Sequence, residues 1–149
     1  MQKSPPMNGE RGINMSRILL LEDDLSLING LTFTFKKQGH EADIARTLDE
    51  AEKIWSDGKY DLLILDVSLP DGSGFDFCKT VRQVSRVPII FLTASDEETS
   101  IIMGLDMGGD DYITKPFKLG VLISRINALL RRVKDFGTAD TELQSNGIR

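Results

Sequence analysis

The chain has a single cysteine, Cys78, in 149 residues, which excludes an intrachain disulfide and any metal site built from several thiolates. Basic residues are outnumbered, with 18 Lys and Arg against 23 Asp and Glu, so the formal net charge is −5. This charge disfavours unaided binding to nucleic-acid phosphates. No apolar run approaches the length of a membrane span, and the N-terminus lacks the apolar core of a signal peptide. We therefore expect a cytoplasmic, soluble protein that does not use a membrane.

The remaining composition is that of one globular domain. A hydrophobic share of 40% and a charged share of 28% are ordinary for a folded protein. Residues 1–15 lack periodicity and are rich in Pro, Gly and polar residues, so we expect a flexible leader or an expression remnant, with Met15 as a candidate natural start. The periodic part covers residues 16–134. Residues 135–149 read as a linker, whose final "NGIR" reads like the beginning of another strand.

Short apolar runs alternate with segments of helical periodicity along residues 16–134. The five runs are Ile18–Leu21, Ala42–Ala45, Leu62–Leu65, Ile89–Leu92 and Tyr112–Thr114. Such repeats predict an α/β fold, a doubly wound parallel sheet of five strands with five helices on its two faces. Burial on both faces explains why the runs are continuous rather than alternating. In these sheets ligands collect at the carboxyl ends of the strands.

Capping residues predict where the helices begin. Asp24 is expected to cap the first helix and Asp96 the fourth, while Thr47 and Glu50 form a capping-box pattern at the second. His40, the only histidine, is expected in a loop after a helix-ending Gly39. Cys78 is expected in a helical core face, so a catalytic Cys–His pair is not predicted.

Polar side chains gather where the predicted strands end. Glu22 and Asp23 follow the first strand, Asp66 the third, Thr93 the fourth and Lys115 the fifth. Two carboxylates about 4 Å apart repel by roughly 4 kcal/mol at an effective dielectric of about 20, so these acids are unfavourable together unless they are protonated or neutralised by a cation. Oxygen ligands without His or Cys favour Mg²⁺. With Lys115 on the opposite side, the space between metal and amine fits a phosphoryl group, and Asp66 is placed to attack one.

The motifs "ILLLEDD", "LLILDVSLPDGSG", "PIIFLTA" and "GGDDYITKPF" resemble, in order and spacing, the signature blocks of response-regulator receiver domains from two-component signalling. The match covers residues 16–134. "DDYITKPF" and the later "ALLRR" resemble the subclass whose receivers precede a winged-helix DNA-binding domain. The resemblance implies the flavodoxin-like (CheY-like) strand order 2-1-3-4-5.

The resemblance also implies a role for each strand-end residue. Asp66 matches the phosphoacceptor, which would take its phosphoryl group from a phosphohistidine of a sensor histidine kinase. Asp23 matches a direct Mg²⁺ ligand, Glu22 a ligand acting through water, and Ser68 the position whose backbone carbonyl completes the metal shell. The protein would thus catalyse its own phosphorylation and slow dephosphorylation without being a turnover enzyme.

Further positions match the switching parts of the family. Lys115 matches the phosphoryl-binding lysine, with a cis bond to Pro116. Thr93 matches the hydroxyl that binds a phosphoryl oxygen, and Tyr112 the aromatic switch that responds to it. Ser68 and Ser95 match positions that tune dephosphorylation, and their small size predicts no unusually long phosphate lifetime.

The winged-helix subclass dimerises through its fourth helix, fifth strand and fifth helix, and this chain keeps part of that pattern. Salt bridges from Asp111 to Arg125 and from Asp110 to Arg132 are expected, while Ile101 and Val121 offer an apolar contact instead of a charged one. The candidate interface is Ile101, Leu105, Asp110, Asp111, Val121, Arg125 and Arg132. DNA binding would require a further C-terminal effector domain beyond the linker.

Three other functions fit part of the pattern. A flavodoxin-like module would need a phosphate-binding loop where Glu22, Asp23 and Asp24 stand. An aspartate-nucleophile phosphatase usually carries a second acid where this chain has Ser68, and a cap domain. A stand-alone receiver or phosphorelay shuttle remains open, although the linker after residue 134 favours a fragment of a transcription regulator.

Overall fold

The computed structural model describes residues 15–94, 102 and 106–143, with side chains described up to residue 132. Its main sheet has five parallel strands in the order β2-β1-β3-β6-β7. The strands are β1 (Ser16–Leu21), β2 (His40–Ala45), β3 (Leu62–Asp66), β6 (Ile89–Thr93) and β7 (Asp111–Thr114). In chain order this is 2-1-3-4-5, so the predicted topology is confirmed.

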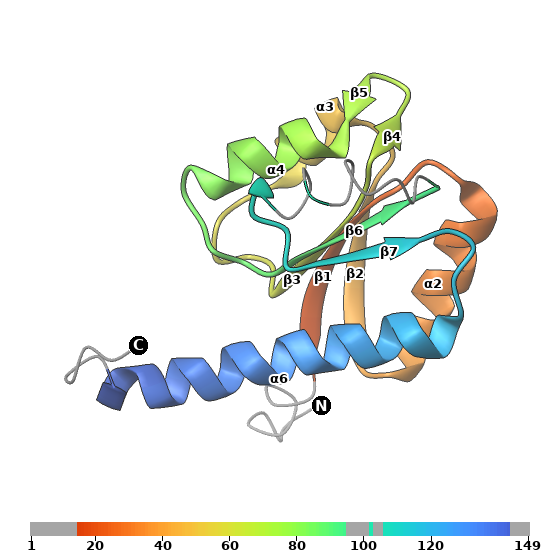
Figure 1. Cartoon of the computed structure of the whole chain (residues 1–149). Coiled ribbons are helices and arrows are strands. Elements are labelled where there is room, and N and C mark those ends of the chain that lie inside the picture. Colours follow the sequence, from red (N-terminus) through yellow and green to blue (C-terminus); the bar gives the residue numbers. More distant parts are fainter. Residues whose placement is uncertain (1–14, 95–101, 103–105, 144–149) are drawn as a thin grey trace, which may run out of the picture.

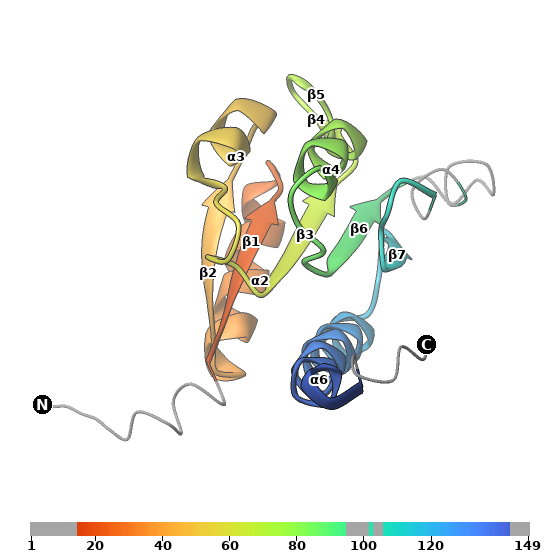
Figure 2. The ribbon, with the colours of Figure 1, turned by 90° about the vertical axis from the view of Figure 1, so that its left-hand side faces the viewer.

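Helices cover both faces of this sheet (Figures 1 and 2). One face carries α2 (Leu25–Lys37) and α6 (Leu119–Leu143), and the other carries α3 (Leu48–Ile54) and α4 (Gly74–Arg82). Successive residues of β3 alternate between the two cores: Leu62 and Ile64 pack under α2 and α6, while Leu63 and Leu65 pack under α3 and α4. This alternation is the reason why the central strands are apolar at every position.

The predicted helix starts are confirmed where the structure describes them. Asp24 Oδ1 accepts from the backbone N–H groups of Ser26 and Leu27, at 3.0 and 3.3 Å. Thr47 accepts from the Glu50 N–H at 3.0 Å, and Glu50 in return accepts from the Arg46 N–H at 2.7 Å. Asp96 lies outside the described residues, as does most of the expected fourth helix.

Two features differ from what the sequence predicts. His40 is not in a loop: it is the first residue of β2, paired in register with Ser16, and it is buried. Pairing with β1 extends β2 backwards over two polar residues that carry no strand pattern of their own. The last helix, α6, continues to Leu143, past residue 134 where the sequence places the end of the domain.

A short hairpin comes directly after β3. Its strands are β4 (Ser68–Leu69) and β5 (Gly72–Ser73), which pair antiparallel and lead into α4. Gly74, the first residue of α4, sits against the carbonyl oxygen of Asp66, and a Cβ at Gly74 would overlap that oxygen. The glycine therefore lets the chain fold back tightly on the end of β3.

An ion-pair network closes the opposite end of the sheet. Tyr60 donates to Asp43 Oδ2 at 2.7 Å, and the Arg17 guanidinium lies 3.2 Å from the same oxygen. Arg17 also pairs with Glu41 at 2.7 Å. The network joins β1, β2 and the segment that leads into β3, far from the carboxyl edge.

Replacing Asp43→Asn is expected to lower the free energy of unfolding by about 1 kcal/mol at pH 7, because Tyr60 and Arg17 lose a charged acceptor. The hydrogen bond from Tyr60, followed by the charge of Arg17, holds the pKa of Asp43 below its ordinary value. The contribution of Asp43 to the free energy of unfolding is therefore complete above the unfolded pKa of about 3.9. It is lost as the pH falls through the lower folded pKa. Urea unfolding of both proteins between pH 7 and pH 2 should show the difference shrinking at the acid end.

Glu41→Gln is the matched control, because Glu41 shares the Arg17 partner but its side chain is 54% exposed. Glu41→Gln should lower the free energy of unfolding by well under about 1 kcal/mol. A difference between Asp43→Asn and wild type that stays constant with pH would contradict the assignment.

Candidate functional site

The polar residues predicted at the strand ends do meet at one edge of the sheet. Glu22 and Asp23 follow β1, Asp66 is the last residue of β3, Thr93 is the last residue of β6, and Lys115 follows β7. β1 and β3 are neighbours, as are β3 and β6, so parallel pairing alone brings these residues together. In this register Asp66 lies opposite Leu92, one residue before Thr93.

Three carboxylates form the centre of the site. Glu22, Asp23 and Asp66 each offer an oxygen, and these oxygens all lie within 4.8 Å of one another. Glu22 is 1% and Asp66 5% exposed, while Asp23 is half-buried and opens the cluster to solvent. Hard oxygen ligands without nitrogen or sulfur suit Mg²⁺, which commonly keeps several waters and shares its shell with phosphate. The donor set therefore fits the metal expected from the sequence.

Lys115 supplies the positive charge of the cluster. Its ammonium lies 3.0 Å from Glu22 Oε1 and 3.1 Å from Asp66 Oδ2. The backbone N–H of Lys115 donates to the Thr93 carbonyl at 2.7 Å, and the Lys115–Pro116 bond is cis, the isomer that the resemblance implied. The amine therefore faces inward. It touches the acids directly, so the expected space between amine and carboxylate is not open in this arrangement.

Burial and charge act against each other on Glu22 and Lys115. Burial is the main cause that raises the pKa of Glu22; the hydrogen bond from Lys115 opposes it, and Asp66 adds to it. Burial acts to lower the pKa of Lys115, but hydrogen bonds and charges from Glu22 and Asp66 raise it overall. The amine is thus held charged by the acids, whereas the cluster keeps an excess of negative charge.

Asp66 is held in one orientation. Its Oδ1 accepts from the Ser68 N–H at 3.1 Å, and its Oδ2 accepts from Lys115. Glu22 is fixed as well, because its Oε2 accepts from the N–H groups of Asp23 and Asp24, each at 3.1 Å. The carboxylates are therefore presented by short, hydrogen-bonded backbone turns at the ends of rigid strands.

Thr93 and Tyr112 lie on the same face of the sheet, on neighbouring strands. Phe91 pairs in register with Tyr112, and their ring centroids are 6.3 Å apart. Thr93 lies two residues after Phe91, so its side chain points to that face too, and it is 2% exposed. Tyr112 is half-buried against the core under α3 and α4. The structure brings together the two residues predicted to form a switch.

The predicted interface residues are partly paired within the chain. Arg125 lies 3.0 Å from Asp111. Asp110 is 3.2 Å from Arg82 and accepts from the Ile89 N–H at 2.8 Å, so its expected partner Arg132 is not the one it contacts here. Val121 and Arg132 are exposed. Ile101, Leu105 and Ser95 lie outside the described residues.

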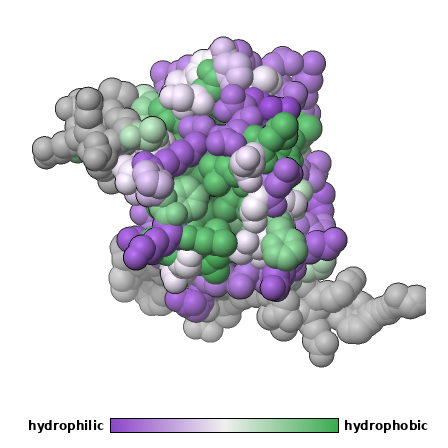
Figure 3. All heavy atoms as spheres, turned by 90° about the vertical axis from the view of Figure 1, so that its right-hand side faces the viewer, coloured by the Kyte–Doolittle hydropathy of each residue, from purple (hydrophilic) through white to green (hydrophobic). Residues whose placement is uncertain are grey.

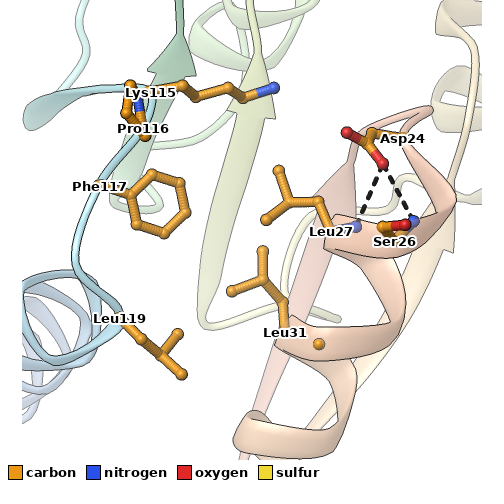
Figure 4. A pocket seen from close by; sticks show the side chains of 9 residues that line it. Asp24, Ser26, Leu27, Leu31, Lys115, Pro116, Phe117 and Leu119 are labelled. Carbon is orange, nitrogen blue, oxygen red and sulfur yellow. Dashed lines mark hydrogen bonds between the residues drawn. The ribbon is translucent and has the colours of Figure 1, made fainter.

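An apolar hollow adjoins Lys115, and sequence reasoning missed it. It is a cavity of about 440 Å³ between the first turns of α2 and the segment joining β7 to α6, lined by Asp24, Ser26, Leu27, Gly30, Leu31, Lys115, Pro116, Phe117 and Leu119. Figure 4 shows Leu27, Leu31, Phe117 and Leu119 converging on it. Figure 3 shows apolar side chains gathered on this face, ringed by polar ones. The helical spacing of Leu27 and Leu31 predicted only that they lie on an apolar helix face. Periodicity does not show whether another element packs on every part of that face.

Within the described residues, no helix is both long and apolar enough to cross a bilayer.

Comparisons with known proteins agree with this geometry. Residues 18–127 match the family model described as the response regulator receiver domain. The uncharacterized transcriptional regulatory protein YclJ of Bacillus subtilis is 41% identical over 83% of this chain and 54% of its own length. The sensory transduction protein RegX3 of Mycolicibacterium smegmatis is 39% identical over 91% of this chain and 60% of its own length. The chain thus spans little more than half of these curated relatives.

Solved structures of response regulators also match this chain. A two-component response regulator from Clostridium difficile superposes with a TM-score of 0.75 at 38% identity, covering 79% of this chain and 98% of that one.

Asp23→Asn is expected to raise the free energy of unfolding by about 1 kcal/mol without divalent metal, because it removes one of three mutually repelling carboxylates. The same change should abolish stabilisation by Mg²⁺, since it removes a carboxylate that is expected to bind the metal. Urea unfolding in EDTA and in Mg²⁺ measures both effects.

Asp24→Asn is the control for this experiment. It removes the neighbouring charge but keeps a residue that caps helices equally well, so both quantities should stay close to wild type. If Asp23→Asn destabilised the metal-free protein, the repulsion described for the cluster would be wrong.

Proposed function

The chain belongs to the response regulator receiver domain family, and we propose that it accepts a phosphoryl group from a sensor histidine kinase on Asp66 with the help of Mg²⁺. One observation carries the proposal: the nearly buried Asp66 carboxylate shares the Lys115 ammonium with Glu22, beside Asp23. No structural need of the fold requires three acids at one sheet edge. The repulsion among these acids is explained if they bind a cation and present a nucleophile.

In this proposal the phosphorus–nitrogen bond of the donor phosphohistidine breaks as a bond forms from an Asp66 oxygen to phosphorus. The kinase histidine keeps the electron pair of the broken bond. Glu22, Asp23 and Asp66, with the Ser68 carbonyl, would hold Mg²⁺, which when bound neutralises phosphoryl charge. Lys115 donates hydrogen bonds to the incoming oxygens in place of Asp66 Oδ2, which opens the space that its present contact fills.

The outcome would be a change of conformation at Thr93 and Tyr112. Thr93 would bind a phosphoryl oxygen, and Tyr112 lies on the same face of the sheet, beside Phe91. A shift from 1:99 to 99:1 needs about 5.5 kcal/mol of differential stabilisation. A few charge-assisted hydrogen bonds of roughly 1.5–3 kcal/mol each come near that value. Ser68 and Ser95 would tune the loss of the phosphate.

The role of the whole protein is inferred from its relatives. Several are transcriptional regulators about twice as long as the matched region. We assign residues 16–134 to the receiver, residues 1–15 to a leader and residues 135–149 to a linker that joins a DNA-binding domain in a cytoplasmic transcription regulator. Phosphorylated receivers would dimerise through Val121, Arg125 and the segment around Asp111, together with Ile101 and Leu105.

The apolar hollow beside Lys115 is the surface that we assign to the phosphodonor protein. It adjoins the site through Lys115 and Asp24, and Leu119, one of its lining residues, is 43% exposed. A donor histidine can reach Asp66 only if its own protein rests next to that edge. An apolar helix face would fill the hollow.

The acceptor is tested by incubation with acetyl phosphate and Mg²⁺, and the product is read by intact mass. Wild type should gain one phosphoryl group, and Asp66→Asn should gain none, because an amide does not attack phosphorus. Lys115→Ala should be phosphorylated at least about tenfold more slowly, since an electrostatic contact in the transition state is lost. Phosphorylation of Asp66→Asn to the wild-type extent would move the acceptor elsewhere. Steady hydrolysis of a phosphate ester such as p-nitrophenyl phosphate, which is not a receiver phosphodonor, would favour a phosphatase.

The docking surface is tested with Leu119→Ser and a phosphorylated sensor kinase that serves wild type. Transfer measured as kcat/KM should fall about tenfold, the equivalent of roughly 1.4 kcal/mol of lost apolar contact. Phosphorylation by acetyl phosphate should not change. Val84→Ser is the control, because Val84 is 61% exposed but precedes β6 at the other end of the strands. Equal losses in the two variants would remove the hollow from the donor's footprint.

A further inference from the structure

Residues 45–49, which join β2 to α3 and which we name the bracket segment, contact both loops of the acidic site. On the β1 side, the Glu22 N–H donates to the Ala45 carbonyl at 3.0 Å. The Arg46 guanidinium donates to the backbone carbonyl of Asp23, also at 3.0 Å. Two hydrogen bonds therefore tie the chain that carries Glu22 and Asp23 to the bracket segment, and neither uses a carboxylate of the site.

On the β3 side, the bracket segment is held by Asp71 in the turn between β4 and β5. Asp71 Oδ1 accepts from the Leu48 N–H at 2.8 Å, and its Oδ2 accepts from the Asp49 N–H at 3.1 Å. These are first-turn donors of α3 that no helical carbonyl can satisfy. The next donor, the Glu50 N–H, is bound by Thr47. Asp71 thus caps a helix from 22 or more residues away and fixes its own hairpin to that helix.

The hairpin fixed in this way is the one that orients Asp66. Ser68, in β4, donates its N–H to Asp66 Oδ1. A continuous set of contacts therefore runs from Asp23 through Arg46, the bracket segment and Asp71 to the hairpin and Asp66. None of its linking residues belongs to the acidic cluster.

We propose that Arg46 and Asp71 are positioning residues that set the separation of the metal-binding oxygens of Asp23 from those of Asp66 and Ser68. The inference rests on the proposed function, since it concerns the same Mg²⁺ site. Mg²⁺ requires nearly ideal octahedral geometry at 2.0–2.1 Å, so small changes in this separation weaken binding. Groups that orient metal ligands typically contribute about 10- to 100-fold to metal affinity or activity.

The sign of the Arg46 effect separates this role from simple electrostatics. Removing a cation close to a cation site should tighten Mg²⁺ binding if charge alone matters. Removing a tether should weaken it. Arg46→Ala therefore has opposite outcomes under the two explanations.

The experiment is calorimetric titration of Mg²⁺ alone into wild type, Arg46→Ala, Asp71→Ala and Asp71→Asn, with thermal melts in EDTA and in Mg²⁺. Arg46→Ala and Asp71→Ala should each bind Mg²⁺ about tenfold more weakly. Asp71→Asn keeps an oxygen acceptor for the helix N-terminus and should lose less of its affinity for Mg²⁺. The increase in Tm caused by Mg²⁺ should shrink in both alanine variants, beyond any change of Tm in EDTA.

Lys53→Ala is the control, because Lys53 pairs with Asp49 on α3 at 3.1 Å but contacts neither loop of the site. It should bind Mg²⁺ as wild type does. Unchanged or tighter binding in Arg46→Ala overturns the positioning role, as does equal weakening in Lys53→Ala. If wild type itself bound no Mg²⁺, the proposed function would fail together with this inference, whereas normal wild-type binding with unaltered variants would remove only the inference.

Discussion

The ammonium of Lys115 between two buried carboxylates is the contact on which the site depends. Glu22 and Asp66 would repel each other and Asp23 across less than 5 Å, and Lys115 reduces that repulsion without removing it. Its partners are 93 and 49 residues away along the chain. Only the parallel sheet, with strand ends converging on one edge, places them together. Three carboxyl groups thus face one amine at this edge, an imbalance of formal charge that a bound cation would reduce.

Backbone groups help to hold the carboxylates at this edge. Asp66 ends a fully buried strand, Gly74 lets α4 begin against its carbonyl, and the N–H of Ser68 orients its carboxylate. Thr93 and Tyr112 lie on neighbouring strands of the same sheet, β6 and β7. A nucleophile held in this way, as proposed for Asp66, would lose little freedom on reacting.

The strands and the acidic edge were predictable because local patterns determine them: continuous apolar runs predict buried strands, and polar residues directly after such runs lie at the carboxyl edge. Side-chain contacts between residues far apart in the sequence were not predictable. Nothing local shows that Asp110 contacts Arg82, that Asp71 caps α3, or that Arg46 reaches the Asp23 carbonyl. His40 was misplaced because strand pairing, not propensity, extends β2. The direct contact of Lys115 with the acids was also missed, since spacing along a chain sets no distance between side chains.

A crystal structure with Mg²⁺ and beryllofluoride would locate both the metal and the acceptor. We expect Mg²⁺ about 2.1 Å from oxygens of Asp23 and Asp66, the beryllium group on Asp66, and the Lys115 ammonium moved from Asp66 Oδ2 onto a fluorine. A metal bound away from these carboxylates, or Lys115 still on Asp66 while the anion sits elsewhere, would contradict it.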